Sequence, residues 1–221
     1  MQGAEILFQG MNLQRMLGGL AVTAQISIVS VLVSIPLGLA MGMLMTLKNP
    51  VLRAVLRVYL DFIRIMPQLV LLFIVFFGTA HIWNLSGEMA SVIVFTLWGA
   101  AELGDLTRGA LESIPASQYD SAYVLGLSKR ETFLRIILPQ AARRLLPSSV
   151  NLVTRMVKTT SLCMLIGVVE VIRVGQQIID LNRFDYPMGA FWVYGEIFFM
   201  YFIICWPLSI VSRRLERRWA K

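Results

Sequence analysis

Five long apolar runs limit what this chain can fold into more than any other feature of its sequence. Each is near the roughly 20 residues that a helix needs to cross the hydrocarbon core of a bilayer. The chain is 57% hydrophobic and 15% charged, which lies outside the range of a soluble globular domain. The sequence therefore predicts an all-α membrane protein with five transmembrane helices. The runs lie at about residues 20–46, 58–79, 89–111, 145–169 and 189–212.

The first ten residues read MQGAEILFQG and precede a second methionine, Met11. This stretch looks like a protease-site tag, so we interpret residues 1–10 as a tag remnant and leave them out of the fold prediction. Residues 11–221 are then predicted to form a single transmembrane domain.

Basic residues alternate along the chain between connections that are rich in them and connections that are poor. The second connection has no Lys or Arg, and the fourth has only Arg173 and Arg183. This alternation follows the positive-inside rule and places the N-terminus outside and the C-terminus in the cytoplasm. It also argues that the net charge of +7 marks membrane orientation rather than a nucleic-acid surface. The basic sets are Lys48, Arg53 and Arg57 in the first connection, Lys129, Arg130, Arg135, Arg143 and Arg144 in the third, and Arg213, Arg214, Arg217, Arg218 and Lys221 in the tail.

The residues that usually build catalytic or metal sites are scarce. There is one histidine, His81, and the two cysteines, Cys163 and Cys205, both lie in apolar runs. A zinc site or a Ser-His relay needs more than these residues offer. We therefore predict no catalytic residue and no metal site.

A polar, turn-punctuated segment at residues 119–140 interrupts the apolar sequence. It carries small residues, then a glycine, then an apolar run that ends in proline, at fixed spacing. It resembles the EAA loop of binding-protein-dependent ABC importers, with two conservative departures at its start. The matching positions are Asp120, Ser121, Ala122, Gly126, Ile136, Leu138 and Pro139.

The resemblance implies a cytoplasmic coupling segment at about residues 113–140, with a short helix at 116–126 that docks in a groove of an ATPase subunit. Ser128 and Glu131 form an S-x-x-E pattern, which predicts a capping box at the start of the next helix. The residues that the resemblance assigns to ATPase coupling are Tyr119, Asp120, Ser121, Ala122, Leu125 and Gly126.

Motifs on both sides resemble the permease subunits of polar amino-acid ABC importers, over residues 18–221. Tyr59, Arg64 and Pro67 match a Y-x-x-x-x-R-x-x-P signature, and Asp105 and Arg108 match an acid and a base of the third run. Glu102 departs from the family, which commonly has an aromatic residue at that position.

Charged residues at membrane depth are normally paired or face a cavity. Arg64 can pair with Asp61, and Arg108 with Asp105, because each pair is three residues apart on a helix. For Glu102, two interpretations stay open, which are lining of the substrate pathway and pairing with a basic residue of another helix.

The fourth run also resembles a family motif, matched at Pro147, Asn151, Lys158, Thr160, Ser161 and Leu162. Thr159 stands where the family has Asp, and Leu152 where relatives often have Glu. Arg155 and Lys158 are either pathway residues or inter-subunit ion-pair partners, for instance of Glu102 or Asp105. The substrate-pathway candidates are Arg64, Glu102, Asp105, Asn151, Arg155, Lys158, Thr159, Thr160 and Ser161.

The resemblance implies a type I ABC importer permease fold and the role of transmembrane subunit of an ATP-driven amino-acid importer in the bacterial cytoplasmic membrane. Its implied partners are a second permease subunit, identical or related, two ATP-binding subunits and an extracytoplasmic substrate-binding protein, besides membrane lipids. Because the chain has no G-x-x-x-x-G-K-[ST] pattern, we expect ATP and Mg²⁺ on the partner ATPase and no cofactor here.

An acidic or neutral polar amino acid is the favoured substrate, because the two family acids are missing. A cationic amino acid, or a derivative such as an opine, stays open because of Glu102. Two other classes fit less well: an intramembrane aspartyl protease using Asp105 and Asp120, and a gated channel with Glu102 and Arg155 as filter charges. Finally, residues 170–188 are amphipathic and are predicted to form an external interfacial helix.

Overall fold

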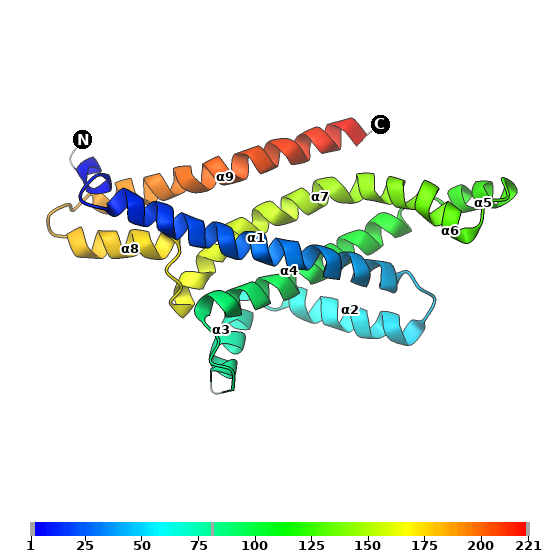
Figure 1. Ribbon diagram of the computed structural model, residues 1–221, viewed down its shortest axis with the longest axis horizontal. Helices are drawn as coiled ribbons and strands as arrows, with labels where there is room; N and C mark the ends of the chain where they lie inside the picture. The colour runs from blue at the N-terminus through cyan, green and yellow to red at the C-terminus, as the bar shows by residue number, and fades with distance from the viewer. Residues whose placement is uncertain (1–2, 81, 220–221) are drawn as a thin grey trace. The chain divides into compact units, whose positions relative to one another are not determined.

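The computed structural model describes residues 3–80 and 82–219, and this part of the chain is helical throughout, without strands. His81 lies outside the described residues. In chain order the elements are η1 (Ala4–Leu7), α1 (Asn12–Met45), α2 (Pro50–Ile65), α3 (Gln68–Thr79), α4 (Gly87–Glu112), α5 (Ala116–Val124), α6 (Lys129–Glu131), a π-helical turn η2 (Thr132–Ile137), α7 (Leu138–Thr159), a 3₁₀ stretch η3 (Thr160–Ile166), α8 (Val171–Asn182) and α9 (Gly189–Trp219) (Figure 1).

Three helices, α1, α4 and α9, are long and apolar enough to cross a membrane without interruption. Two further spans result if each of two interrupted helix pairs counts as one, which gives up to five within the described residues. The all-α fold class is therefore confirmed, but the second apolar run is broken within its length, and the fourth belongs to a helix that is bent from α8 at residues 167–170, at the end of the run.

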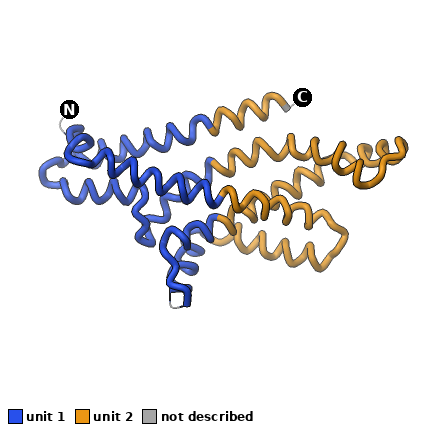
Figure 2. The backbone as a smooth tube through the Cα atoms, in the orientation of Figure 1, with its two compact units in different colours: residues 1–30, 67–95, 154–207 blue, residues 31–66, 96–153, 208–221 orange. Residues whose placement is uncertain are grey.

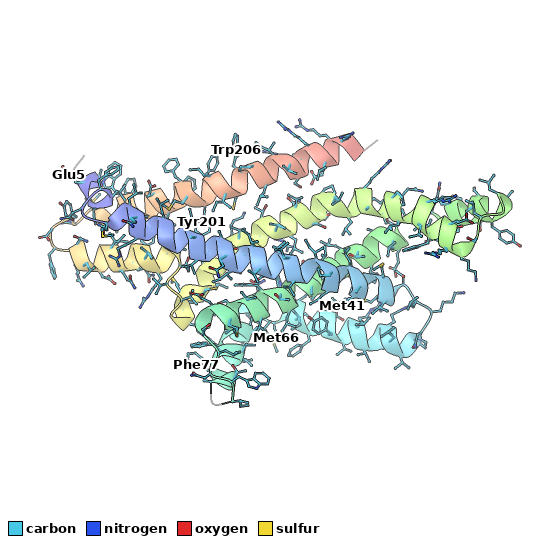
Figure 3. All side chains as sticks on the ribbon, viewed as in Figure 1. Glu5, Met41, Met66, Phe77, Tyr201 and Trp206 are labelled. Atoms are coloured by element: carbon cyan, nitrogen blue, oxygen red, sulfur yellow. The ribbon has the colours of Figure 1, made fainter. Side chains whose placement is uncertain are left out.

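The second run breaks because of proline. Met66, labelled in Figure 3, ends α2 with an extended backbone (ψ 136°), and Pro67 caps α3. The ring of a proline disfavours helical geometry in the preceding residue, so a helix ends there. Asn49 begins α2, since its side chain accepts hydrogen bonds from the N–H groups of Val51 and Leu52.

The chain forms two compact units, and each long helix contributes residues to both (Figure 2). Unit 1 comprises residues 1–30, 67–95 and 154–207, and unit 2 comprises residues 31–66, 96–153 and 208–221.

The core of unit 1 contains apolar residues of η1, α1, α8 and α9. Ile6 is fully buried and Leu7 nearly so, although these residues belong to the stretch that we had left out of the fold. The origin of that stretch as a tag stays a prediction, but Ile6 and Leu7 take part in the packing. The buried members are Ile6, Leu7, Met16, Val171, Val174, Ile178, Val193, Ile197 and Met200.

Glycines on α1 allow close helix packing within the chain. In unit 1, a Cβ on Gly19 would lie 2.9 Å from the backbone of Val171. In unit 2, a Cβ on Gly38 would lie 2.7 Å from the Cβ of Leu103, and one on Gly42 would collide with Thr107. These small residues of α1 therefore serve tight helix packing inside one subunit.

In unit 2, a second cluster fastens the coupling segment to the end of α4. Ile137 of η2 is fully buried, and it clusters with the buried residues Ala110 and Leu111 of α4, Ile114 just after α4, and Ala141 of α7. The polar segment is thus held by an apolar base, and α5 and α6 project beyond it (Figure 1).

Candidate functional site

The helix α5 presents apolar side chains to its surroundings. Tyr123 is 83% exposed, Val124 84% and Leu125 75%, whereas Ala122 is fully buried. Exposed apolar side chains that gather at one tip mark a contact surface more often than isolated ones do. Of the six predicted coupling residues, Ala122 alone faces inward, while Tyr119, Asp120, Ser121, Leu125 and Gly126 are exposed.

Gly126 ends α5 in the way that its place in the motif predicts. Its φ of +71° is left-handed, a conformation that glycine adopts at little cost. The N–H of Leu127 donates to the carbonyl of Ala122 at 3.1 Å, and the N–H of Gly126 to that of Tyr123 at 3.0 Å. These bonds satisfy carbonyls at the end of the helix, as in a Schellman-type cap.

The predicted capping box is confirmed. The hydroxyl of Ser128 accepts from the N–H of Glu131, and the carboxylate of Glu131 accepts from the N–H of Ser128 at 3.1 Å. The hydrogen bond from the Ser128 hydroxyl is the main cause that lowers the pKa of Glu131. The two caps give the turn at residues 125–128 a defined geometry.

A hollow of about 490 Å³ lies beside this turn. Tyr119 and Tyr123 of α5 form one wall, and Thr132 and Phe133 of η2 another. Lys48, from the connection between α1 and α2, and Lys129 give the rim a positive charge. The arrangement offers aromatic contact and positive charge on the same surface.

The second candidate region is a chain of ion pairs that joins α2 to α4. The Nε of Arg64 donates to the Oε1 of Glu102 at 2.9 Å, and its Nη1 donates to the Oδ2 of Asp105 at 2.7 Å. Arg108 donates to the Oδ1 of Asp105 at 2.6 Å and to the Oε2 of Glu112 at 2.6 Å. We call these five residues the charge ladder.

The ladder confirms one predicted pair and corrects another. Arg108 binds Asp105, as the spacing of three predicted. The prediction that Arg64 pairs with Asp61 was wrong, because Arg64 binds Glu102 and Asp105 of α4. Both interhelical bonds use one guanidinium, which can hold two carboxylates with its fork of donors.

Glu102 pairs with a basic residue of another helix, which was one of the two open interpretations. That residue is Arg64. The side chain of Glu102 is only 13% exposed, so its charge is held by the guanidinium rather than by bulk water. The hydroxyl of Tyr59 also crosses to α4, where it donates to the carbonyl of Leu97 at 3.0 Å, and this contact keeps α2 in register.

The ladder opens onto a hollow of about 370 Å³ between α4 and α7, lined among others by Asp105, Arg108 and Ser148. Arg144 reaches it from α7 and donates to the carbonyl oxygen (2.6 Å) and the hydroxyl (2.7 Å) of Ser113. Sequence reasoning did not single out this contact, because Arg144 appeared only as a member of a basic connection.

In unit 1, three predicted pathway hydroxyls bind their own helix. Thr159 donates to the carbonyl of Arg155 at 2.9 Å, Thr160 to that of Val157 at 2.7 Å, and Ser161 to that of Lys158 at 2.9 Å. These bonds satisfy carbonyls where α7 gives way to the 3₁₀ stretch η3. The hydroxyls have a structural use at this break, and their role in substrate binding stays a prediction.

The remaining candidates lie on exposed parts of α7. Arg155 and Lys158, three residues apart, are both exposed in unit 1. In unit 2, the amide of Asn151 donates to the Oε1 of Glu216 at 3.5 Å. The structure thus brings Arg64, Glu102 and Asp105 together.

Sequence reasoning missed the one fully buried carboxylate among the described residues. Glu170 was counted in an amphipathic external stretch, but it is 0% exposed and caps α8, where it accepts from the N–H of Arg173 at 2.9 Å. The hydroxyl of Thr23 also donates to it at 3.4 Å. An acid directly before the apolar-periodic residues of α8 is an N-cap signal that could have identified it.

The acids proposed for an aspartyl protease do not form a catalytic pair. Asp105 accepts hydrogen bonds from Arg64 and Arg108, and Asp120 lies exposed on α5. Within residues 3–80 and 82–219, no three His, Cys, Asp or Glu side chains gather in a way that could hold a metal ion.

Comparisons with solved structures support the fold. A chain of a crystal structure of an amino acid ABC transporter with histidines superposes with a TM-score of 0.83 at 22% identity, over 93% of this chain and 94% of that one. A chain of the MetNI methionine ABC transporter in an inward-facing conformation gives a TM-score of 0.67 at 16% identity, over 96% and 97%. At such identities the likeness shows the fold alone.

Sequence comparisons show closer relatives. The probable glutamine ABC transporter permease protein GlnP of Bacillus subtilis is 33% identical over 90% of this chain and 91% of its own length. The L-cystine transport system permease protein TcyB of the same organism is 34% identical, over 91% and 85%. The glutamine transport system permease protein GlnP of Escherichia coli is 32% identical, over 90% of each chain.

Residues 34–221 match a family described as the binding-protein-dependent transport system inner membrane component. This match covers most of the chain and includes the coupling segment, the charge ladder and α7. Relatives above 30% identity extend over nine-tenths of the chain. The chain therefore belongs to the family of inner-membrane components of binding-protein-dependent transport systems, as a permease subunit.

Proposed function

We propose that this permease carries a neutral polar or acidic amino acid, in a complex with a second permease subunit, two ATPase subunits and an extracytoplasmic binding protein. ATP and Mg²⁺ bind on the ATPase subunits, whose closure moves α5. The proposal is supported by relatives whose names specify glutamine and cystine transport and by the geometry of the two regions described above.

The tip of α5 carries the coupling part of this proposal. Three consecutive apolar residues, Tyr123, Val124 and Leu125, are at least 75% exposed, and the segment behind them is held by the buried Ile137. An exposed tip on a firmly seated base is suited to receive force from a partner. The positive rim at Lys48 and Lys129 favours an acidic groove in that partner.

The charge ladder carries the substrate part. Selection of a cationic substrate needs a carboxylate that is not already held by a cation. Glu102 is bound by Arg64, and the two positions where relatives often carry acids are Thr159 and the buried Leu152. Arg155 and Lys158 are exposed cations. This distribution favours a substrate whose side chain is neutral or negative.

The coupling proposal is tested with Tyr123→Ala, which removes an exposed aromatic contact without disturbing the interior. We expect loss of most ATPase association in a pull-down from membranes, since aromatic anchors commonly account for more than 1 kcal/mol of binding. Phe184→Ala is the matched control, because Phe184 is also aromatic and 86% exposed but lies in unit 1. Equal ATPase recovery with both variants would reject α5 as the coupling element.

The substrate proposal is tested with Glu102→Gln in proteoliposomes that contain the whole transporter. Wild type should take up glutamine or glutamate faster than arginine. In the variant, Asp105 is the one acid of α4 that still binds Arg64, so part of the positive charge of Arg64 is no longer compensated. This charge favours an acidic substrate, and the ratio of glutamate to glutamine uptake should therefore rise. Glu112→Gln removes the same charge from the outer end of the ladder and should leave the ratio unchanged. Preferential arginine uptake by wild type would refute the substrate class.

A further inference from the structure

The last two turns of α9 carry a basic face. Arg213, Arg214 and Arg217 line a hollow of about 210 Å³ together with Ile210. The three arginines follow Ile210 by three, four and seven residues, which places the four side chains on one side of the helix. All three arginines are exposed, so the hollow is accessible.

The opposite side of this helix end is fixed to α7. The buried hydroxyl of Ser212 donates to the carbonyl of Pro147 at 3.0 Å and to the Oε1 of Glu216 at 3.3 Å. The same carboxylate oxygen accepts from the amide of Asn151 at 3.5 Å. Glu216 is the one acid in residues 212–218, and its carboxylate therefore points toward Ser212 and Asn151, away from the basic face.

The basic face consequently lacks a counter-charge in the part of the chain that the structure describes. None of the ion pairs there involves Arg213, Arg214 or Arg217. Three guanidinium groups around one hollow match the oxygens of a phosphate, which arginine binds in bidentate fashion. The negative end of the helix dipole holds the cations in place but does not neutralise them.

The position of the hollow favours a lipid headgroup as the source of such a phosphate. The arginines directly follow the apolar run at 189–212, in a helix that is long and apolar enough to span the membrane. Basic clusters next to a spanning helix attract anionic lipids. Ile210 supplies an apolar wall on the membrane side of the arginines, where a lipid continues into its glycerol and acyl groups.

We propose that Ile210, Arg213, Arg214 and Arg217 form a binding site for the headgroup phosphate of an anionic phospholipid. The site ties the end of α9 to the membrane surface while Ser212 ties it to α7. It depends on α9 spanning the membrane and is independent of the substrate and of ATPase coupling.

The test compares lipid binding by two single variants of the full chain, Arg217→Gln and Arg218→Gln. Both remove one arginine from the same turn, but only Arg217 lines the hollow. Native mass spectrometry of the detergent-purified protein, titrated with phosphatidylglycerol or phosphatidylcholine, gives the affinity for each lipid. We expect Arg217→Gln to weaken phosphatidylglycerol binding about fivefold and Arg218→Gln to have little effect.

Phosphatidylcholine should bind weakly to all forms, and millimolar inorganic phosphate should not displace phosphatidylglycerol. Equal effects of the two variants, or equal binding of both lipids, would overturn the site. Displacement by inorganic phosphate would overturn the lipid as its ligand. A triple variant, Arg213→Gln with Arg214→Gln and Arg217→Gln, should abolish the preference while its melting temperature and ATPase association stay near those of wild type. Loss of ATPase association with an unchanged lipid preference would overturn the lipid site and would not test the coupling proposal.

Discussion

At the scale of single residues, the charge ladder shows which ion pairs can be predicted from a sequence and which cannot. The pair Asp105–Arg108 lies within one helix, so a spacing of three residues was enough to predict it. The pair Arg64–Glu102 joins residues 38 positions apart, and a linear sequence contains no register between two helices. The sequence indicated that Glu102 needs a basic partner, but only the packing of α2 on α4 identifies Arg64 as one.

Asp105 occupies the middle of the ladder, and this position sets the cost of removing it. Asp105→Asn should lower the free energy of unfolding by about 1–3 kcal/mol, because two partly buried guanidinium groups lose a charged acceptor. Glu112→Gln is the comparison, since that side chain is 49% exposed and makes one pair, worth up to about 1 kcal/mol. Thermal unfolding in detergent should therefore give the lower melting temperature for Asp105→Asn. A lower value for Glu112→Gln would contradict the ranking.

At the scale of elements, the termini of helices were more predictable than their continuity. Gly126 and the Ser128–Glu131 box were visible as local patterns, because a cap depends on residues next to each other. The break at Met66 and Pro67 has a local cause too, but composition alone had merged α2 and α3 into one apolar run. The change from α7 to η3 has no comparable signal, since Thr159 and Thr160 are compatible with either helix.

The capping box makes the start of α6 sensitive to acid. The pKa of Glu131 is lowered in the folded state, so its stabilising effect is present at neutral pH and is lost as pH falls below the ordinary range of glutamate. At these low pH values, amide hydrogen exchange at Ser128 should be faster relative to exchange in a Glu131→Gln variant at the same pH. Taking the ratio to the variant removes the intrinsic dependence of the exchange rate on pH. A wild-type to variant ratio that stays constant with pH would rule out a role for the ionised carboxylate.

At the scale of the whole molecule, charge distribution and hydropathy predicted the membrane class, and comparisons with relatives confirmed the family. The orientation in the membrane stays a prediction of the basic connections. Packing between subunits cannot be derived from one chain, because a partner surface looks like any other exposed apolar stripe. The exposed faces of α1 and α9 illustrate this, since Leu32 and Ile203 are 63% and 68% exposed and suit lipid and protein equally.

Orientation can be measured with two cysteines on opposite predicted sides. In a background without Cys163 and Cys205, Ser128→Cys should react with a membrane-impermeant maleimide only after the cytoplasmic face is opened. Arg183→Cys should react in intact cells, because its connection is predicted to lie outside. Both positions are exposed, so accessibility of the side chain does not limit the reaction. Labelling of Ser128→Cys in intact cells would invert the topology.

The exposed apolar residues at the end of α5 have a consequence for a subunit that has not yet assembled with its partners. A copy without its ATPase displays Tyr123, Val124 and Leu125 to the surrounding water, and such a display is what chaperones and quality-control proteases bind. The feature that we propose to transmit movement in the complete transporter would thus also mark an orphan copy for removal. Balanced synthesis of the two kinds of subunit becomes a condition for the survival of this one.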